Sequence, residues 1–229
     1  MSLPENLKFD PGSFSGVVRL FPLPNLVLFP HVLQPLHIFE PRYCEMLEAA
    51  LADDRLIAMS LLQAGWENDY EGRPPVYPMA CLGQIVTHVR LPDGRHNLLL
   101  AGVSRVRLGC ELPVTTLYRS APASLCVDVS TEASASMVEA LTHRLLAVFR
   151  DALPNTKEAQ VPLTQLLQNN IDLGALTDII AYTLDLDLTT KIGLLAECSV
   201  SARAKQLLVR LEGQDAKARA TFPPDFSAN

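Results

Sequence analysis

The sequence has few positive charges, no long apolar run and no paired cysteines. Its 19 Lys and Arg residues against 25 Asp and Glu give a net charge of −6. This balance disfavours nucleic acid and anionic membrane surfaces as partners, because both are bound by neutralising phosphates. No stretch reaches the roughly 18 apolar residues that a membrane-spanning helix requires. The N-terminal residues lack the basic and apolar regions of a signal peptide, so we expect a cytoplasmic protein without a membrane partner.

The cysteines are odd in number and widely spaced. None of the five belongs to a C-x-x-C pair: Cys44, Cys81, Cys110, Cys126 and Cys198. This pattern disfavours a disulfide framework and a structural zinc site, and it is typical of free thiols in a reducing compartment. We therefore expect no bound metal.

The motifs that commonly carry catalysis or hold a nucleotide are also missing. The sequence has no G-x-x-x-x-G-K-[ST], G-x-G-x-x-G, H-E-x-x-H or G-x-S-x-G, which predicts no cofactor. Two pairs keep a hydrolase open as an alternative. Ser201 and Lys205 are four residues apart on a predicted helix. His37 and Glu40 are three apart, but on a strand that step places side chains on opposite faces. We assign no catalytic residue.

The first part of the sequence is typical of short β-strands. With 48% hydrophobic and 19% charged residues the sequence can build a packed core. Short apolar runs alternate with Pro- and Gly-containing turns, which predicts a closed or nearly closed antiparallel sheet. The expected strands are 17–21, 26–29, 33–39, 56–62, a hairpin over 81–108, and 124–129.

From about residue 130 the apolar spacing becomes helical. Helices are predicted around 137–148, 173–184, 189–197 and 200–211, which together favour a small bundle. Ser199 is placed to cap the last helix and Gly213 to end it. On that amphipathic helix we expect the charged residues to face outward.

The predicted fold class is therefore α+β, with an N-terminal antiparallel β pseudo-barrel followed by a C-terminal helical bundle. We place the barrel subdomain at 16–130 and the helical bundle at 131–213. Residues 1–15 and 214–229 lack periodicity, and we expect them to be mobile.

The stretch PLHIFEPRY, residues 35–43, gathers side chains suited to acid–base chemistry, but it is explained as the start of a helix. Pro41 suits the first helical position, where its missing N–H costs nothing, and Glu40 then occupies the cap. Phe39 would pack back onto the first turn. Arg42 points away from the apolar helix face, toward an acidic residue or a backbone carbonyl. The stretch predicts a strand-to-helix corner.

One internal segment, residues 63–78, is polar, rich in Pro and Gly, and too long for a simple turn. It contains the only tryptophan, Trp66, together with Tyr70 and Tyr77. Aromatic residues in a polar loop commonly anchor binding partners. The alternative is that these rings fold back and cover the edge of the barrel.

Three segments resemble the N-terminal domain of Lon proteases, also called the LON domain. LFPLPNLVLFPHVLQPLHIFEPRYCEML (20–47) is similar to its opening signature. CLGQIVTHVRLPDGRHNLLLAGVSRVRL (81–108) and ALTDIIAYTLDLDLTTKIGLLAECSVSARAKQLLVRL (175–211) are similar to two later segments. The sequence departs from the family pattern at 192–193 and 202–203. The likeness spans residues 16–212 and implies a PUA-like pseudo-barrel followed by helices.

The resemblance implies a recognition module that binds unfolded polypeptide or a protein partner. Full-length Lon proteases add an ATPase module and a protease module, and this sequence has no P-loop, so the resemblance implies no catalysis. We expect the partner to contact the loop aromatics and the barrel rim. The candidate contact residues are Trp66, Tyr70, Tyr77, Phe29 and His31.

A nucleic-acid function is a further alternative, because PUA-like barrels resemble folds that bind RNA. A basic strip on the 81–108 hairpin would carry it, formed by Arg90, Arg95, Arg105 and Arg107. The net charge of −6 makes this the weakest of the three hypotheses.

Overall fold

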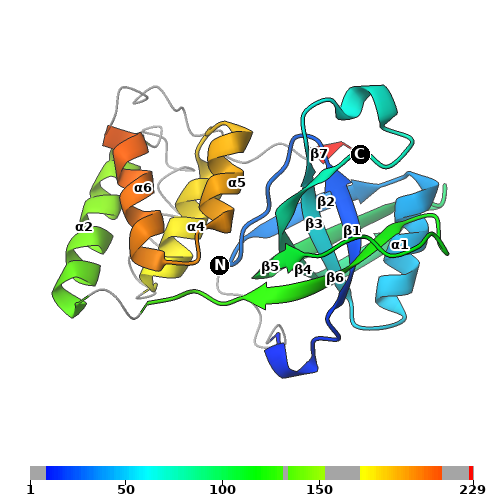
Figure 1. Ribbon diagram of the computed structural model, residues 1–229, viewed down its shortest axis with the longest axis horizontal. Coiled ribbons are helices and arrows are strands. Elements are labelled where there is room, and N and C mark those ends of the chain that lie inside the picture. Colours follow the sequence, from blue (N-terminus) through cyan, green and yellow to red (C-terminus); the bar gives the residue numbers. More distant parts are fainter. Residues whose placement is uncertain (1–8, 131–133, 153–170, 213–226, 229) are drawn as a thin grey trace. The chain divides into compact units, whose positions relative to one another are not determined.

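The computed structural model describes residues 9–130, 134–152, 171–212 and 227–228, which divide into two compact units. The first unit comprises the described residues up to Cys126 together with strand β7, and the second runs from Val127 to Glu212. The first consists mainly of strands and the second of helices (Figure 1). The predicted α+β class, a β pseudo-barrel followed by a helical bundle, is confirmed.

The described elements follow one another in the order that the sequence predicts. They are η1 (Pro11–Ser13), β1 (Val17–Leu23), β2 (Leu33–Ile38), α1 (Pro41–Leu51), β3 (Leu56–Leu62), η2 (Trp66–Asp69), β4 (Val76–Arg90), β5 (His96–Leu108), β6 (Arg119–Cys126), α2 (Ala135–Ala152), α4 (Leu173–Thr183), α5 (Leu188–Ala196), α6 (Val200–Glu212) and β7 (Ser227–Ala228).

Five of the described strands close into a barrel. They neighbour one another in the order β4–β3–β1–β6–β5, and β5 pairs with β4 to complete the ring. The pairings are antiparallel, as predicted, except that β1 and β3 run parallel. The parallel pair arises because the chain crosses over through β2 and α1 between these two strands. Strand β2 joins β5 outside the ring, and β7 lies along β2.

The interior of the barrel is filled by small and medium apolar side chains on alternate strand residues. Ala58, Ala80 and Ala121 are fully buried in this cluster, which suits the narrow interior of a five-stranded ring. Phe9 and Phe14, which flank η1, pack against the same cluster although they fall within the terminus that we expected to be mobile.

The predicted strand at 26–29 is wrong. Residues 24–32 belong to no described strand, although Val27, Leu28 and Phe29 are buried. A strand with one wet face would alternate buried and exposed residues, whereas here three consecutive side chains enter the core. The apolar run therefore signals burial of an irregular segment, and it is this segment that crosses β5.

The crossing occurs at Gly102. A Cβ atom on this residue would lie 2.0 Å from the carbonyl oxygen of Phe29, so only glycine fits. Its N–H donates to the carbonyl of Val32 at 2.8 Å, and its carbonyl accepts from the N–H of His31 at 2.9 Å. Gly102 also marks where β5 changes partner, since residues before it pair with β2 and residues after it with β6.

Replacement of Gly102 by alanine is expected to destabilise the barrel unit by about 3 kcal/mol or more, because the clashing atoms are backbone and cannot rotate away. Urea denaturation followed by circular dichroism measures the loss. Gly193→Ala in α5 is the control, since a Cβ there meets nothing within 4 Å. The control should gain about 0.5–1 kcal/mol from helix propensity. Equal stability of Gly102→Ala and the wild type would contradict the crossing.

The second unit is a bundle in which α6 packs against α2, α4 and α5. The inner face of α2 is formed by Leu141, Leu145 and Phe149. The Ser199 cap is confirmed, because its Oγ accepts from the N–H of Ala202 at 3.4 Å. Gly213, the predicted helix stop, lies outside the described residues.

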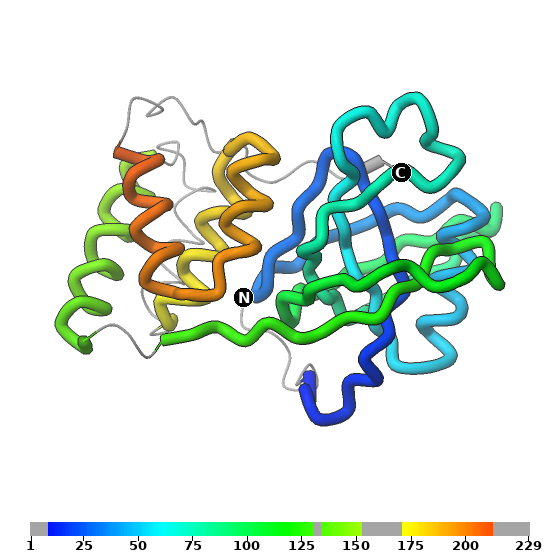
Figure 2. Tube along the Cα trace, viewed as in Figure 1, coloured from blue at the N-terminus to red at the C-terminus, as the bar shows by residue number. Residues whose placement is uncertain are grey.

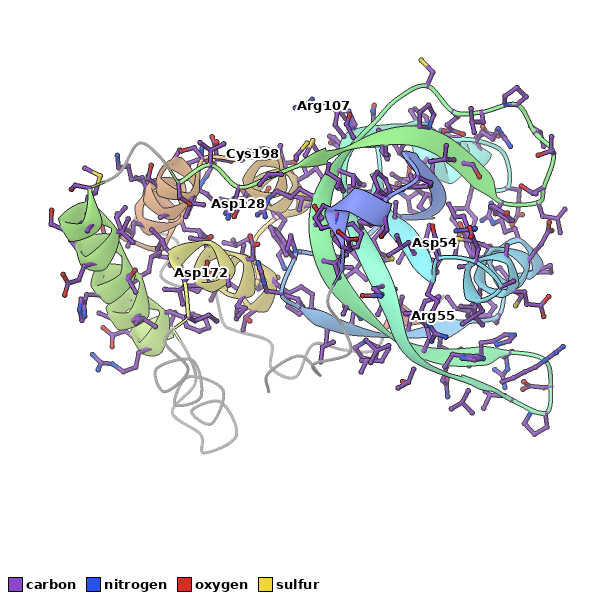
Figure 3. The ribbon with its side chains drawn as sticks, turned by 90° about the horizontal axis from the view of Figure 1, so that it is seen from below. Asp54, Arg55, Arg107, Asp128, Asp172 and Cys198 are labelled. Atoms are coloured by element: carbon purple, nitrogen blue, oxygen red, sulfur yellow. The ribbon has the colours of Figure 1, made fainter. Side chains whose placement is uncertain are left out.

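The expectation that the charged residues of α6 face outward is wrong for Arg203, whose side chain is 0% exposed. Its Nη1 and Nη2 donate to the two carboxylate oxygens of Asp128 at 3.1 and 2.5 Å. Its Nε donates to Oγ1 of Thr177 at 2.9 Å, and Nη1 donates to the carbonyl of Glu197 at 2.7 Å. Asp178, also 0% exposed, lies 3.4 Å from Nε. The labelled Asp128 lies among the helices of this unit (Figure 3).

Replacement of Arg203 by methionine is expected to destabilise the helical unit by about 3–5 kcal/mol, because it leaves carboxylates in the interior without their cation. Arg144→Met is the matched control. Arg144 also forms two hydrogen bonds to one carboxylate, that of Glu212, but it is 62% exposed. An exposed pair contributes about 1 kcal/mol or less. Thermal unfolding of both variants checks the contrast, and equal losses would argue against a structural role for the buried cation.

Candidate functional site

The strand-to-helix corner is built as the sequence predicts, with one exception. Strand β2 ends at Ile38, Glu40 is the N-cap residue of α1, and Pro41 is the first helical residue. The Glu40 side chain does not cap the helix but points to other partners. Phe39 is 45% exposed, so the prediction that it packs on the first turn is wrong.

Glu40 and Arg42 form a network that reaches across the chain to Tyr70. Nε of Arg42 donates to Oε2 of Glu40 at 2.9 Å, and the hydroxyl of Tyr70 donates to Oε1 at 2.8 Å. Nη1 of Arg42 donates to the Tyr70 carbonyl at 3.1 Å. Burial, followed by the bond to Glu40, raises the pKa of Tyr70. The phenol therefore remains a donor at neutral pH.

The guanidinium of Arg42 also lies over two aromatic rings. Its central carbon is 4.8 Å from the ring centre of Tyr43 and 4.8 Å from that of Tyr70. Such contacts are favourable because the ring face is negative. Tyr43 is buried, its hydroxyl donates to the carbonyl of Pro22 at 3.3 Å, and its ring meets Phe21 edge-on at 4.6 Å. Arg42 thus joins the core of the barrel to the loop.

The predicted binding loop is held at both its base and its middle. At the base, Gln63 accepts no strand partner but donates from its backbone to Pro75 at 2.8 Å and from its side chain to Val76 at 2.7 Å. In the middle, Tyr70 binds the corner, and Trp66 contacts it edge-on at 5.5 Å. Beyond the strands, this segment forms the projecting cyan-to-teal loop of Figure 2.

The five predicted contact residues are not all brought together. Trp66 and Tyr70 are half-exposed neighbours in the loop, and Tyr77 is half-exposed on β4. Phe29 is 0% exposed, packed where the chain crosses β5, so a partner cannot reach it in this arrangement. His31 is exposed in the turn that follows, with a left-handed φ of 65°.

A pocket of about 300 Å³, here called the corner pocket, opens between the corner, the second half of the loop and a third segment. It is lined by Leu20, Pro22, Arg42, Tyr43, Glu71, Gly72, Arg73, Val114, Thr116, Leu117, Tyr118 and Arg119. The floor is aromatic and apolar, and guanidinium groups stand around it. Glu111 binds Arg119 through both carboxylate oxygens and lies 3.7 Å from Arg73, so these cations are already paired.

The third segment, residues 109–118, was missed by the sequence analysis. Leu112, Val114 and Leu117 are 39%, 66% and 64% exposed, which makes the mouth of the corner pocket apolar. The N–H of Leu117 donates to Glu45 of α1 at 3.4 Å, so the segment is attached to the same corner. The available signal was an apolar, Pro-containing stretch without periodicity between two strands.

The candidate catalytic pairs are directed elsewhere. Nδ1 of His37 is hydrogen-bonded to Asn97 at 2.6 Å, whereas Glu40 binds Arg42 and Tyr70. Ser201 contacts the hydroxyl of Ser199 at 3.4 Å, with no hydrogen bond to Lys205 in the described part of α6. Among the residues that the structure describes, no group of three His, Cys, Asp or Glu side chains is arranged to hold a metal ion.

The basic strip suggested for RNA is not assembled. Arg105 is 2% exposed, so it cannot contribute to a surface. Arg95 is paired with Asp93 at 2.5 Å, and Arg90 lies 3.9 Å from Glu48. Arg107 alone of the four is exposed without an ion pair in the described structure.

A small β pseudo-barrel with an apolar corner pocket, joined in the chain to a helical unit, defines the class of protein. Residues 17–213 match the family described as the ATP-dependent protease La (LON) substrate-binding domain. The chain belongs to this family.

Relatives in sequence are much longer proteins. The chain is 23% identical over 207 residues to Lon protease of Rhizobium meliloti (strain 1021), covering 90% of this chain and 25% of that protein. It is 27% identical over 192 residues to Lon protease 2 of Myxococcus xanthus, covering 84% and 23%. The chain thus spans about a quarter of the length of these relatives. The matched part is their substrate-binding domain and not their catalytic part.

Two solved structures share the fold. A Lon N-terminal domain protein from Xanthomonas campestris superposes with a TM-score of 0.62 at 21% identity, covering 84% of this chain and 97% of that one. The N-terminal domain of Mycobacterium avium complex Lon protease gives 0.65 at 15% identity, covering 86% and 98%. No helix in the described ranges is long and apolar enough to span a membrane.

Replacement of Tyr70 by phenylalanine is expected to release the loop from the corner, because Glu40 loses the phenolic donor at its Oε1. Loss of a hydrogen bond to a charged group costs about 1.5–3 kcal/mol. Hydrogen exchange of the amides in 64–75 should accelerate about tenfold or more. Tyr77→Phe is the control, since no hydrogen bond of its hydroxyl is found among the described residues. Unchanged exchange in Tyr70→Phe would show that the network does not hold the loop.

Proposed function

We propose that this chain is a non-catalytic recognition module that binds unfolded polypeptide or a partly folded protein partner. The observation that carries the proposal is the corner pocket, where the corner, the loop and residues 109–118 present exposed apolar side chains around one opening. Membership of a substrate-binding family supports it. The contact residues in this proposal are Trp66, Tyr70 and Tyr77 with Val114 and Leu117.

The chemistry of the corner pocket favours apolar or aromatic side chains as ligands. Its guanidinium groups lie against aromatic rings or carboxylates, so they offer flat stacking surfaces more than free positive charge. A volume of about 300 Å³ accommodates one or two side chains and not a folded domain. Binding would therefore be weak for any single segment and tolerant of its sequence.

Polypeptide binding is tested with a reduced, carboxymethylated protein that stays unfolded, using fluorescence anisotropy. The double variant Val114→Asp, Leu117→Asp should weaken binding about tenfold, because buried charge at the mouth opposes apolar contact. The control Val17→Asp, Val127→Asp introduces the same charge at exposed valines, 43% and 74%, outside the pocket.

Equal binding by both double variants would contradict the role of the corner pocket, and absence of binding by the wild type would contradict polypeptide recognition. Incubation with casein and ATP in the same buffer should leave the casein intact. Peptide release that disappears in Ser201→Ala would overturn the non-catalytic part of the proposal.

A further inference from the structure

Strand β2 has an outer edge that the barrel does not use. It lies outside the closed ring and is joined to it through β5 along one side, from Leu33 to Ile38. The N–H and C=O groups on the other side of such a strand are available to another extended chain. An edge of this kind is where proteins accept a peptide as an added strand.

Pro35 identifies the backbone groups that face this edge. A proline cannot donate to a ladder, so within β2 its nitrogen must point away from β5. Backbone N–H groups alternate in direction along a strand, which places those of Leu33 and His37 on the same outer side. The edge therefore offers two donors separated by a proline, an arrangement that tolerates one added strand but disfavours extended aggregation.

The described structure already places a strand on this edge. Ser227 and Ala228 form β7, which runs parallel to β2 with Ser227 opposite Leu36 and Ala228 opposite His37 (Figure 1). β7 occupies two positions of a six-residue strand, and the first half of β2 has no partner on this side among the described residues. The edge is thus able to accept a strand and is only partly covered.

The face beside the open edge is apolar. Leu33 and Pro35 are half-buried on the side of β2 opposite to its core residues, and Pro35 is paired with half-buried Leu99 on β5. His37 continues this face and is held by Asn97. Alternate side chains of an added strand would lie over this strip, so a segment with apolar residues at every second position fits it.

We infer that the outer edge of β2 binds an extended segment of the client polypeptide as a parallel strand, in place of Ser227–Ala228. The inference rests on the proposed function in that the ligand is a polypeptide, but it assigns the contact to the ligand's backbone. Main-chain pairing requires no particular side chain, which provides the sequence tolerance that unfolded clients demand.

The first test changes the ligand and leaves the protein intact. A short fluorescein-labelled peptide with valine at alternate positions is made in two N-methylated forms, each blocking one set of alternate amides. An added strand pairs through one set, so one form should lose at least about tenfold in affinity while the other binds like the parent. Equal loss or equal binding of both forms would overturn the inference.

The second test vacates the edge in the full chain. Ser227→Pro with Ala228→Pro removes both β7 donors, and the parent peptide should then bind about three- to tenfold more tightly. Ser227→Ala with Ala228→Ser keeps the donors and should bind as the wild type does. An unchanged affinity in the proline variant would overturn the replacement of β7 by the client.

The two proposals fail separately. Peptide binding that is insensitive to N-methylation register but lost in Val114→Asp, Leu117→Asp would leave the corner pocket as the site and overturn the edge. Register-dependent binding that survives those substitutions would support the edge and contradict the corner pocket. If neither the peptide nor the unfolded protein binds, both proposals are wrong.

Discussion

The barrel depends on the close approach of two backbones at Gly102. Strand β5 has two sides but three partners, because β4 takes one side along its length while β2 and β6 share the other. The change from β2 to β6 happens where residues 24–32 cross, and only a residue without a side chain permits that contact. The crossing holds β2 outside the ring. It thereby fixes both the open edge of β2 and the corner that follows it.

Two arginines then attach distant segments to this frame, with different consequences. Arg203 is fully buried among carboxylates and carbonyls, so its role is to hold the helices of its own unit together. Arg42 is 18% exposed and lies between two tyrosine rings at the corner pocket. A guanidinium is suited to both positions because it is planar, permanently charged and able to donate in several directions. Its surroundings decide whether it serves packing or leaves a surface for a ligand.

Much of the fold could be predicted because local patterns determine it. The buried run 56–62, the 81–108 hairpin, the Pro41 helix start and the Ser199 cap each depend on neighbours within a few residues. The errors have a different origin. The apolar run at 26–29 has the composition of a strand, but being a strand requires a partner that sequence does not show. Arg203 looked like a surface charge because its partners lie 26 and 75 residues away.

The candidate site was predictable only in part, for the same reason. The loop aromatics stood out by composition, and Tyr70 does reach the corner pocket's wall through Arg42. Phe29 stood out equally, yet the crossing at Gly102 buries it. Residues 109–118 had no periodic pattern, so nothing in the sequence connected Val114 and Leu117 with a corner some 70 residues earlier, to which the N–H of Leu117 binds at a separation of 72 residues.

The corner pocket and the β2 edge lie in the same unit and select by opposite rules. A pocket distinguishes side chains by size and polarity, whereas a strand edge accepts any extended backbone without proline at the paired positions. Each contact alone is weak, since a small apolar cavity and a few main-chain hydrogen bonds must offset the entropy of ordering a flexible chain. A ligand segment that engages both gains from the second contact being intramolecular. A folded protein hides its backbone amides and its apolar side chains together, so the combination favours chains that have lost their fold.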